Sequence, residues 1–299
     1  MKKTMTLLAL LSLSATCYAQ ESLQAMYARV PAPPANSAAA AAWLKSPAVT
    51  QLQAQIKAQR AGIEKTMAAA TAAQQPAGGP EDFARAASDP KYAAELKAKI
   101  ARMTPAEQMA FAQRMSAATS ANALRDVKAM ANDPPAVGTA VDNYLAYQGR
   151  NMSLSDLMAA SQKITAIRDR VGKREMEISS AAAKKLQCSD GEGGCPSAAA
   201  EAADKATLHA AWTQVIAEYD RALPEISKQF AAVRQARSAD IATGQRDMAA
   251  TQYGAAAQSP TNRQQLATYH GALLTEVEQL LQTSIDTAEW AAGRYDAQK

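Results

Sequence analysis

The sequence predicts an all-α protein organised around a long antiparallel helical hairpin. Its 299 residues are poor in aromatic side chains (5%) and rich in alanine, glutamine, methionine and leucine, which favour helices. Apolar residues recur every three or four positions over long stretches, whereas the alternating runs that are typical of strands are scarce. We therefore expect a coiled-coil-like hairpin within a three- or four-helix bundle, together with a lobe of short helices.

Residues 1–19 have the pattern of a secretory signal peptide. Two lysines precede an apolar core at 5–13, and a cleavage context ends at Ala19. The apolar core is too short to span a bilayer. We expect cleavage near Ala19 and a periplasmic or secreted protein, whose formal charge falls from +4 to +2 as the two lysines leave. Lipidation of Cys17, which would give an outer-membrane lipoprotein, is the alternative.

The next segment, residues 20–46, carries few structural signals. Several prolines interrupt it, so we expect a flexible N-terminal arm, or one that packs through Trp43. Ser46 and Pro47 then supply an N-cap and a first-turn proline. They begin a helix over 47–75 that is predicted to join the bundle, and a Gln-, Pro- and Gly-rich break follows it.

Residues 81–150 are predicted to form a lobe of short helices, because start and stop signals alternate along them. Thr104 and Glu107 have the spacing of a capping box around Pro105. Ser120 is predicted to start a further helix. The run from Met103 to Gln108 resembles the Leu-Thr-x-x-Gln motif of the Spy family of helical periplasmic chaperones, with methionine replacing leucine and the glutamine one position late. A generic capping box explains the same residues.

Residues 153–244 carry the predicted hairpin. Apolar residues recur every seven positions in the first arm and in steps of four and three in the second, which is the pattern of coiled-coil-like packing. A glycine-rich turn with Cys188 and Cys195 joins the arms. If these cysteines pair, the facing core residues are Val171 with Trp212, Ile164 with Tyr219, and Leu157 with Ile226. The apolar stripes of the two arms thus face each other in the register that the cysteine pair sets, which predicts antiparallel arms.

Cleavage of the signal peptide would leave two cysteines in the mature chain, Cys188 and Cys195. Two thiols that close a short loop are expected to form a disulfide in an oxidising compartment. A zinc site would need further ligands nearby, and a redox-active pair typically has Cys-x-x-Cys spacing. We therefore predict a structural disulfide. Beyond the hairpin, Ser259 and Pro260 start a C-terminal bundle helix over 259–293.

The sequence contains no motif with a recognisable chemistry. Its two histidines, His209 and His270, lie on different predicted helices, and no nucleophile elbow, phosphate-binding loop or zinc-protease motif occurs. We predict no catalytic, cofactor-binding or metal-binding residues and no enzymatic activity. The exception would be a carboxylate-based site assembled from separate helices. The near-neutral charge also argues against a nucleic-acid partner.

Two further patterns have ordinary structural explanations. Methionine thioethers can bind copper, but Met103, Met109 and Met115 are six residues apart and fall off a common helical face. We expect these side chains to fill gaps in the core. The basic run over 168–174 is interspersed with acidic residues, as on a solvated helix face.

These observations favour an exported bacterial envelope protein that acts as a structural or protein-interaction module, with protein partners and no transmembrane segment. A component of a secretion or conjugation apparatus is one form of this hypothesis, by fold-level analogy. Self-association through the hairpin, giving a homo-oligomer, is another. A Spy-like periplasmic chaperone for unfolded clients is the alternative. The sequence identifies neither the partner nor the client.

Overall fold

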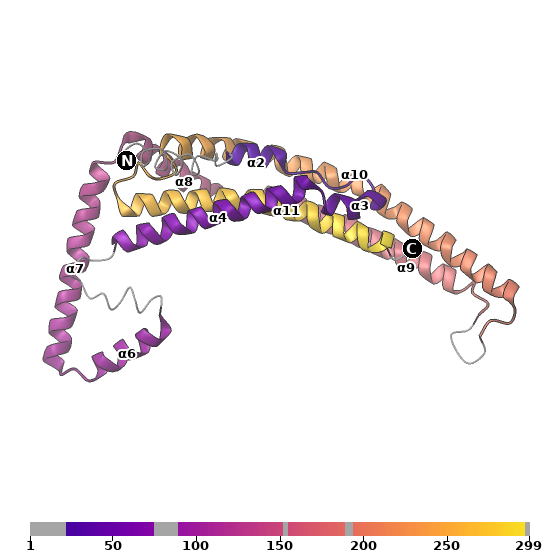
Figure 1. Ribbon diagram of the computed structural model, residues 1–299, viewed down its shortest axis with the longest axis horizontal. Helices are drawn as coiled ribbons and strands as arrows, with labels where there is room; N and C mark the ends of the chain where they lie inside the picture. Colours follow the sequence, from indigo (N-terminus) through magenta and orange to yellow (C-terminus); the bar gives the residue numbers. More distant parts are fainter. Residues whose placement is uncertain (1–21, 75–88, 152–154, 189–193, 297–299) are drawn as a thin grey trace, which may run out of the picture. The chain divides into compact units, whose positions relative to one another are not determined.

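The computed structural model describes residues 22–74, 89–151, 155–188 and 194–296, and this part of the chain is all-α. No β-strand occurs in these ranges. The helices, in chain order (Figure 1), are α2 (Leu23–Arg29), α3 (Ser37–Leu44), α4 (Pro47–Gln74), α6 (Pro90–Ala101), α7 (Pro105–Ala131), α8 (Pro135–Asn151), α9 (Ser155–Ala183), α10 (Ala198–Ala250) and α11 (Pro260–Asp296). The predicted signal peptide lies outside the described residues.

The chain divides into two compact units, each assembled from separated segments. The first unit comprises Met1–Lys57, Arg150–Ala242 and Thr275–Lys299. The second comprises Ala58–Gly149 and Thr243–Leu274. Each unit therefore combines segments that the sequence assigns to different predicted regions.

Several helices begin where the sequence predicts, at a proline that follows a polar residue. The helices α4 and α11 start at Pro47 and Pro260. At the start of α7, the Thr104 hydroxyl accepts a hydrogen bond from the Glu107 N–H (3.3 Å), and the Glu107 carboxylate accepts one from the Thr104 N–H (2.7 Å). The predicted capping box is thus present, and it satisfies two N–H groups that the helix leaves unpaired.

The stretch after this cap differs from the predicted lobe of short helices. The sequence predicts a new helix at Ser120, but α7 runs unbroken over 27 residues (Figure 1). No glycine or proline lies between residues 106 and 131, and alanines dominate the stretch. A serine acts as a cap only where the chain leaves the helical conformation. Ser120 therefore continues the helix.

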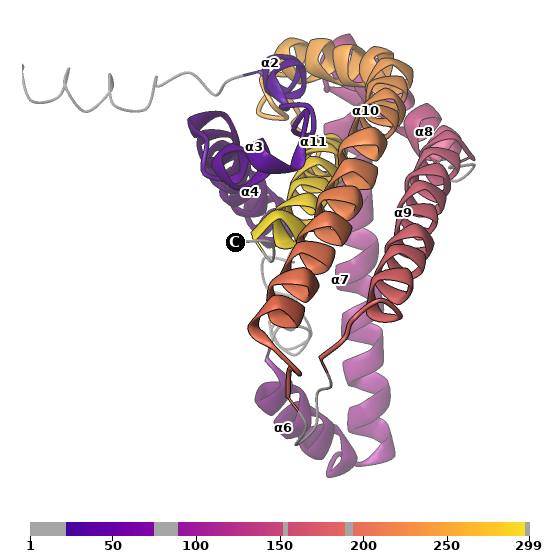
Figure 2. The ribbon, with the colours of Figure 1, turned by 90° about the vertical axis from the view of Figure 1, so that its right-hand side faces the viewer.

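In the first unit, α9 and α10 pack against each other through their apolar stripes. The chain turns between these two helices (Figure 2), and Cys188 and Cys195 belong to this turn. The buried cluster of the two helices contains Ile164, Ile167, Val171, Ile178, Val215, Tyr219, Ala222 and Ile226. Trp290 of α11 packs against the same cluster. Residues of three helices thus contribute to one core.

The segment 22–46 is packed, which differs from the flexible arm that the sequence predicts for 20–46. The helix α2 buries Leu23, Met26 and Tyr27. Their spacing of three and four residues gives even this short helix a buried face. Trp43 packs against a second buried cluster, which includes alanines of α11. The alternative of packing through Trp43 therefore describes this segment better.

Polar contacts also hold this N-terminal segment in place. The Ser37 N–H and hydroxyl both donate to Oδ1 of Asp220, each at 2.7 Å. The Tyr27 hydroxyl donates to the Arg234 carbonyl at 3.0 Å. Burial raises the pKa of Tyr27 to about 12, so its phenol remains protonated at neutral pH. Both contacts join α10 to residues about two hundred positions earlier.

The second unit has an aromatic core and a fixed turn between α10 and α11. The Tyr269 ring lies 5.3 Å from that of Tyr144 and 5.4 Å from that of Tyr147, which joins α8 to α11. Asp133, which follows α7, accepts a hydrogen bond from the Ser259 N–H at 3.2 Å. The end of α7 is thereby anchored at the start of α11.

Candidate functional site

The clearest concentration of exposed apolar side chains in the described part of the chain lies on α7. The described part of the chain exposes seven large apolar residues. Four of them belong to α7, namely Met109 (65% exposed), Leu124 (65%), Val127 (62%) and Met130 (36%). None of the described side chains of α7 is buried. The helix α7 is therefore the strongest candidate for a surface that contacts a partner.

These four side chains form a row along α7. At about 100° per residue, Met109 and Val127 point in the same direction, and Leu124 and Met130 lie within about 60° on either side. We call Met109, Leu124, Val127 and Met130 the apolar row. Another side of the helix is anchored, because Oδ1 of Asp126 accepts a hydrogen bond from the Ser259 hydroxyl at 2.5 Å. Asp126 projects about 100° from Met109 and about 40° from Met130, so the anchor borders one side of the apolar row.

A row of basic residues lies beside the apolar row. Arg114, Arg125 and Lys128 project about 100–160° from the direction of Met109, and all three are exposed. We call these three residues the basic row. Among the described residues, no ion pair joins any of them to a carboxylate. Lys128 therefore borders the apolar row, about 40° from Leu124, whereas Arg114 and Arg125 lie further round the helix.

The acidic residues near the basic row are engaged by the backbone or by hydroxyl groups. Hydrogen bonds from Thr104 hold the pKa of Glu107 below its usual value. Burial raises the pKa of Asp126, but hydrogen bonds from Ser259 and Thr261 outweigh it and leave the pKa lowered. Asp89 caps α6 by accepting from the Lys91 N–H at 3.0 Å. These carboxylates stabilise helix ends and do not neutralise the basic row.

The preceding helix α6 adds further positive charge. It buries Leu96, and four exposed basic side chains lie on it or directly after it, namely Lys91, Lys97, Lys99 and Arg102. The Gln108 side-chain amide donates to the carbonyls of Ile100 (3.2 Å) and Met103 (3.3 Å), which fixes the turn between α6 and α7. Gln108, the glutamine of the Spy-like run, therefore has a local structural role.

The predicted disulfide is present at the turn between α9 and α10. The sulfur atoms of Cys188 and Cys195 are 2.08 Å apart. Asp204, which is buried, accepts from the N–H groups of Gln187 (2.9 Å) and Cys188 (2.8 Å). The sequence did not predict this role of Asp204, because its partners lie 16 and 17 residues earlier and no local pattern connects them.

The other predicted site residues belong to the buried core of the first unit. Ile164, Val171, Tyr219 and Ile226 all lie in the α9–α10 cluster, and Trp212 packs against it. The side chain of Leu157 lies outside the described residues. The individual facing pairs remain predictions. These described residues thus contribute to the packing of the core.

Tyr219 links this core to two charged residues. Its hydroxyl donates to Oε2 of Glu175 at 2.8 Å and accepts from Nε of Arg294 at 3.1 Å. The Tyr219 ring lies 4.2 Å from the Trp290 ring. Burial raises the pKa of Tyr219, and the phenol therefore remains neutral. The cluster joins α9, α10 and α11 and leaves the phenol doubly hydrogen-bonded.

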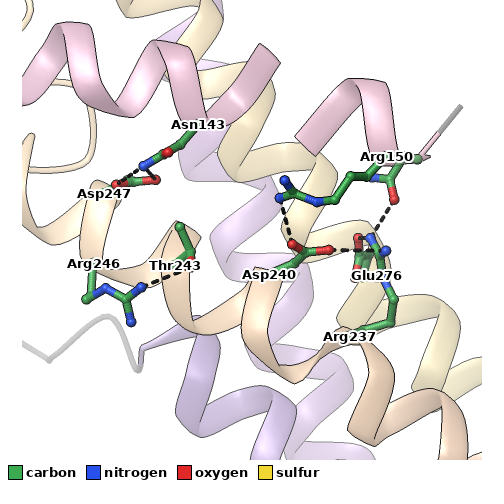
Figure 3. A network of polar contacts seen from close by, with 9 residues as sticks. Asn143, Arg150, Arg237, Asp240, Thr243, Arg246, Asp247 and Glu276 are labelled. Atoms are coloured by element: carbon green, nitrogen blue, oxygen red, sulfur yellow. Dashed lines mark hydrogen bonds and ion pairs between the residues drawn. The ribbon is translucent and has the colours of Figure 1, made fainter. Parts of the chain in front are cut away.

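A partly buried ionic cluster in the described part of the first unit surrounds Arg237 (Figure 3). The guanidinium donates to Oε2 of Glu276 at 3.0 Å and to the Asn151 side chain at 2.5 Å, and it lies 3.2 Å from Oδ2 of Asp240. Arg150 contacts Asp240 at 2.7 Å. Because cations and carboxylates neutralise one another here, the cluster has the character of a structural ion-pair network.

In the second unit, two buried polar groups have shifted pKa values. Burial raises the pKa of Asp247, whose carboxylate accepts from the Asn143 amide at 3.0 and 3.1 Å (Figure 3). Burial lowers the pKa of His270 to about 4, and its Nε2 has no hydrogen-bond partner among the described residues. His270 is therefore neutral at pH 7, and its ring packs 5.4 Å from that of Tyr253. His209 is exposed.

No family model, curated protein or solved structure matches this chain. Among the described residues, no group of three or more His, Cys, Asp or Glu side chains is placed to hold a metal ion. None of the helices in this part of the chain has the length and apolar character needed to cross a membrane. The chemistry of α7 alone therefore supports the candidate site.

Proposed function

We propose that this protein is an exported bacterial envelope protein that acts as a structural and protein-interaction module, with α7 as its docking surface. The observation that carries the proposal is that α7 exposes the apolar row and buries none of its described side chains. Helices in proteins gain most of their stability from packing an apolar face. A partner that covers the apolar row would supply the packing that this chain does not.

The remainder of the described structure supports a scaffolding role. Buried apolar clusters join α9, α10 and α11, as in the hairpin and bundle that we propose for the first unit. The disulfide between Cys188 and Cys195 is compatible with an oxidising compartment such as the periplasm. A protein with packed helices and one uncovered helix suits a component of a secretion or conjugation apparatus.

A Spy-like chaperone is the second candidate, and the same surface favours it. An apolar row beside a basic row could hold unfolded clients of many kinds, since neither row requires a unique sequence. The two functions differ in selectivity. An interaction module should select one partner at α7, whereas a chaperone should contact many clients and suppress their aggregation.

Site-specific photocrosslinking tests the proposed docking surface. A photoreactive residue replaces Leu124, and a matched control replaces Met176 of α9, which is equally exposed (64% against 65%). Each variant of the full chain is irradiated in envelope extract of the source organism. One discrete crosslinked partner at position 124 and none at 176 is the expected result.

Other crosslinking patterns would contradict the proposal. Many products at position 124, together with suppressed aggregation of an unrelated unfolded protein, would identify a chaperone. Equal products at positions 124 and 176, or none at either, would exclude α7 as a dedicated docking surface.

A further inference from the structure

We infer that the surface of α7 fits an acidic amphipathic helix of another protein, with an apolar row lying beside a row of carboxylates. This inference rests on the proposed function and specifies its partner. Three features of the described residues carry it. They are the distribution of side-chain sizes along the apolar row, the unneutralised basic row beside it, and the capping of the nearby acids.

Side-chain size along the apolar face suits a helix as the occupant. Large side chains lie at its two ends, at Met109 and at Leu124, Val127 and Met130. Between them most exposed residues on this face are small, namely Ala112, Ser116, Ser120 and Ala123, whereas Gln113 is a longer polar side chain about 40° from the direction of Met109. Small residues allow two helices to approach closely, and larger residues at both ends fix their alignment. The methionines adapt to the partner's shape.

Charge determines which helix fits. Residues 89–131 contain seven basic and four acidic residues, a formal charge of +3. Three of those acids, Asp89, Glu107 and Asp126, accept hydrogen bonds at helix ends. The basic row is exposed, and a hydrogen bond from Arg125 to Asn122 Oδ1 (2.6 Å) leaves its positive charge in place. A partner with carboxylates beside its apolar row would pair with Lys128, which borders Leu124, as the apolar rows meet, and the positive charge of Arg114 and Arg125 would add a weaker, longer-range attraction.

The same features disfavour two other occupants. In an antiparallel pair of α7 helices, the basic rows of the two copies would lie on the same side and repel each other. A lipid surface favours amphipathic helices with Trp, Phe and Leu on the apolar face. The basic row would suit an anionic lipid surface, but the apolar row contains neither Trp nor Phe, and the exposed residues between Met109 and Leu124 on this face are Ala, Ser and Gln.

Binding of two designed peptides to the full mature chain tests the inference. Both peptides are fluorescently labelled helices of the same length with a leucine row. One carries glutamates beside that row and the other carries lysines. Fluorescence anisotropy should show that the glutamate peptide binds at least about tenfold more tightly at low salt, and that the preference shrinks in about 0.5 M salt.

Charge reversal provides the decisive variant. The change Arg114→Glu with Arg125→Glu and Lys128→Glu should invert the preference towards the lysine peptide. The matched control, Lys163→Glu with Lys173→Glu and Lys184→Glu, alters the net charge equally at exposed positions in and directly after α9 and should keep the preference for glutamate. Leu124→Ser with Val127→Ser should abolish binding of both peptides. Because all these positions are exposed, circular dichroism should show every variant folded.

Several outcomes would overturn the inference. Equal affinity for the two peptides, or binding of neither, would exclude an acidic helix as the partner of α7. Binding to phosphatidylglycerol vesicles in place of the peptides would identify a lipid surface. A dimer that Leu124→Ser disrupts would identify a second copy as the occupant. If photocrosslinking at position 124 still gives one partner, the proposed function stands, and only the inference that the partner is an acidic helix is wrong.

Discussion

Gly244 of α10 lies directly against the side chain of Leu273 of α11. A Cβ atom added to Gly244 would lie 2.1 Å from Leu273 Cδ1, well inside the van der Waals contact distance. Leu273 is fully buried, so its side chain has little room to move away. The two helices of the second unit can approach this closely only because position 244 has no side chain.

Gly244→Ala should therefore destabilise the protein. Overpacking costs about 1–3 kcal/mol, and the better helix propensity of alanine offsets roughly 0.5–1 kcal/mol of this. The net loss should appear as a lower urea midpoint. Gly172→Ala is the matched control, because that glycine is also helical and a Cβ atom added to it would meet nothing within 4 Å. It should raise stability slightly. Equal effects of the two changes would contradict the close contact.

Asp204 should stabilise the disulfide-linked turn. Asp204→Ala would leave the N–H groups of Gln187 and Cys188 without their acceptor, and we expect a loss of about 1–3 kcal/mol in the free energy of unfolding. The exposed Asp169→Ala serves as the control. A double-mutant cycle with Cys188→Ser and Cys195→Ser should show coupling between the carboxylate and the disulfide. Strictly additive losses would mean that Asp204 acts independently of the turn.

His270 should make stability depend on pH below neutrality. Its pKa is about 4 in the folded protein, against an ordinary value of 6.5. Between these values the unfolded chain binds the additional proton, so the free energy of unfolding falls as the pH drops from 6.5 towards 4 and is unaffected above this range. The full effect is about 3 kcal/mol.

Urea unfolding between about pH 4 and pH 8 measures this dependence. His270→Gln should flatten the profile below pH 6.5, whereas the exposed control His209→Gln should reproduce the parent profile. A parent and a His270→Gln profile of the same slope would show that the histidine titrates normally.

Arg237 should contribute far more to stability than an exposed arginine. Arg237→Ala removes the guanidinium from Glu276 and Asp240, whose side chains are only 12% and 15% exposed. We expect a loss of about 2–4 kcal/mol. In the control Arg170→Ala, the partner Glu225 is 48% exposed, and the loss should stay below about 1 kcal/mol. Thermal unfolding distinguishes the two cases.

Local signals in the sequence predict the helix starts but not the packing of the N-terminal segment. The capping box at Thr104, the prolines at 47 and 260, and the cysteine pair each act over a few residues, and the structure contains all of them. The N-terminal segment is different, because its order depends on Asp220, which lies 183 residues from Ser37. A single sequence gives no indication of contacts across such a separation.

The sequence also does not predict the candidate site on α7. Met109 and Leu124 have the pattern of core positions, because an apolar residue at helical spacing is normally buried. The two short helices predicted there also placed them on separate elements. Only the unbroken helix aligns them in one row, and only the structure shows that the row is uncovered.

Amide hydrogen exchange should show that α7 is among the least protected of the described helices. None of the described side chains of α7 itself is buried, whereas opening residues 266–281 of α11 exposes a row of buried leucines. Local opening free energy follows the apolar contacts that are lost. Peptides from 105–131 should therefore exchange at least roughly tenfold faster than those from 266–281.

Adding the glutamate peptide then tests whether fast exchange in α7 reflects a surface that a partner would cover. If the apolar row awaits a partner, the peptide should slow exchange in α7 and leave exchange in residues 266–281 unchanged. Leu124→Ser with Val127→Ser should remove this protection, and the unbound variant serves as its own reference because serine is a weaker helix former than leucine. Protection of α7 equal to that of α11 in the unbound protein would mean that α7 is already covered, and the docking surface would have to be sought elsewhere.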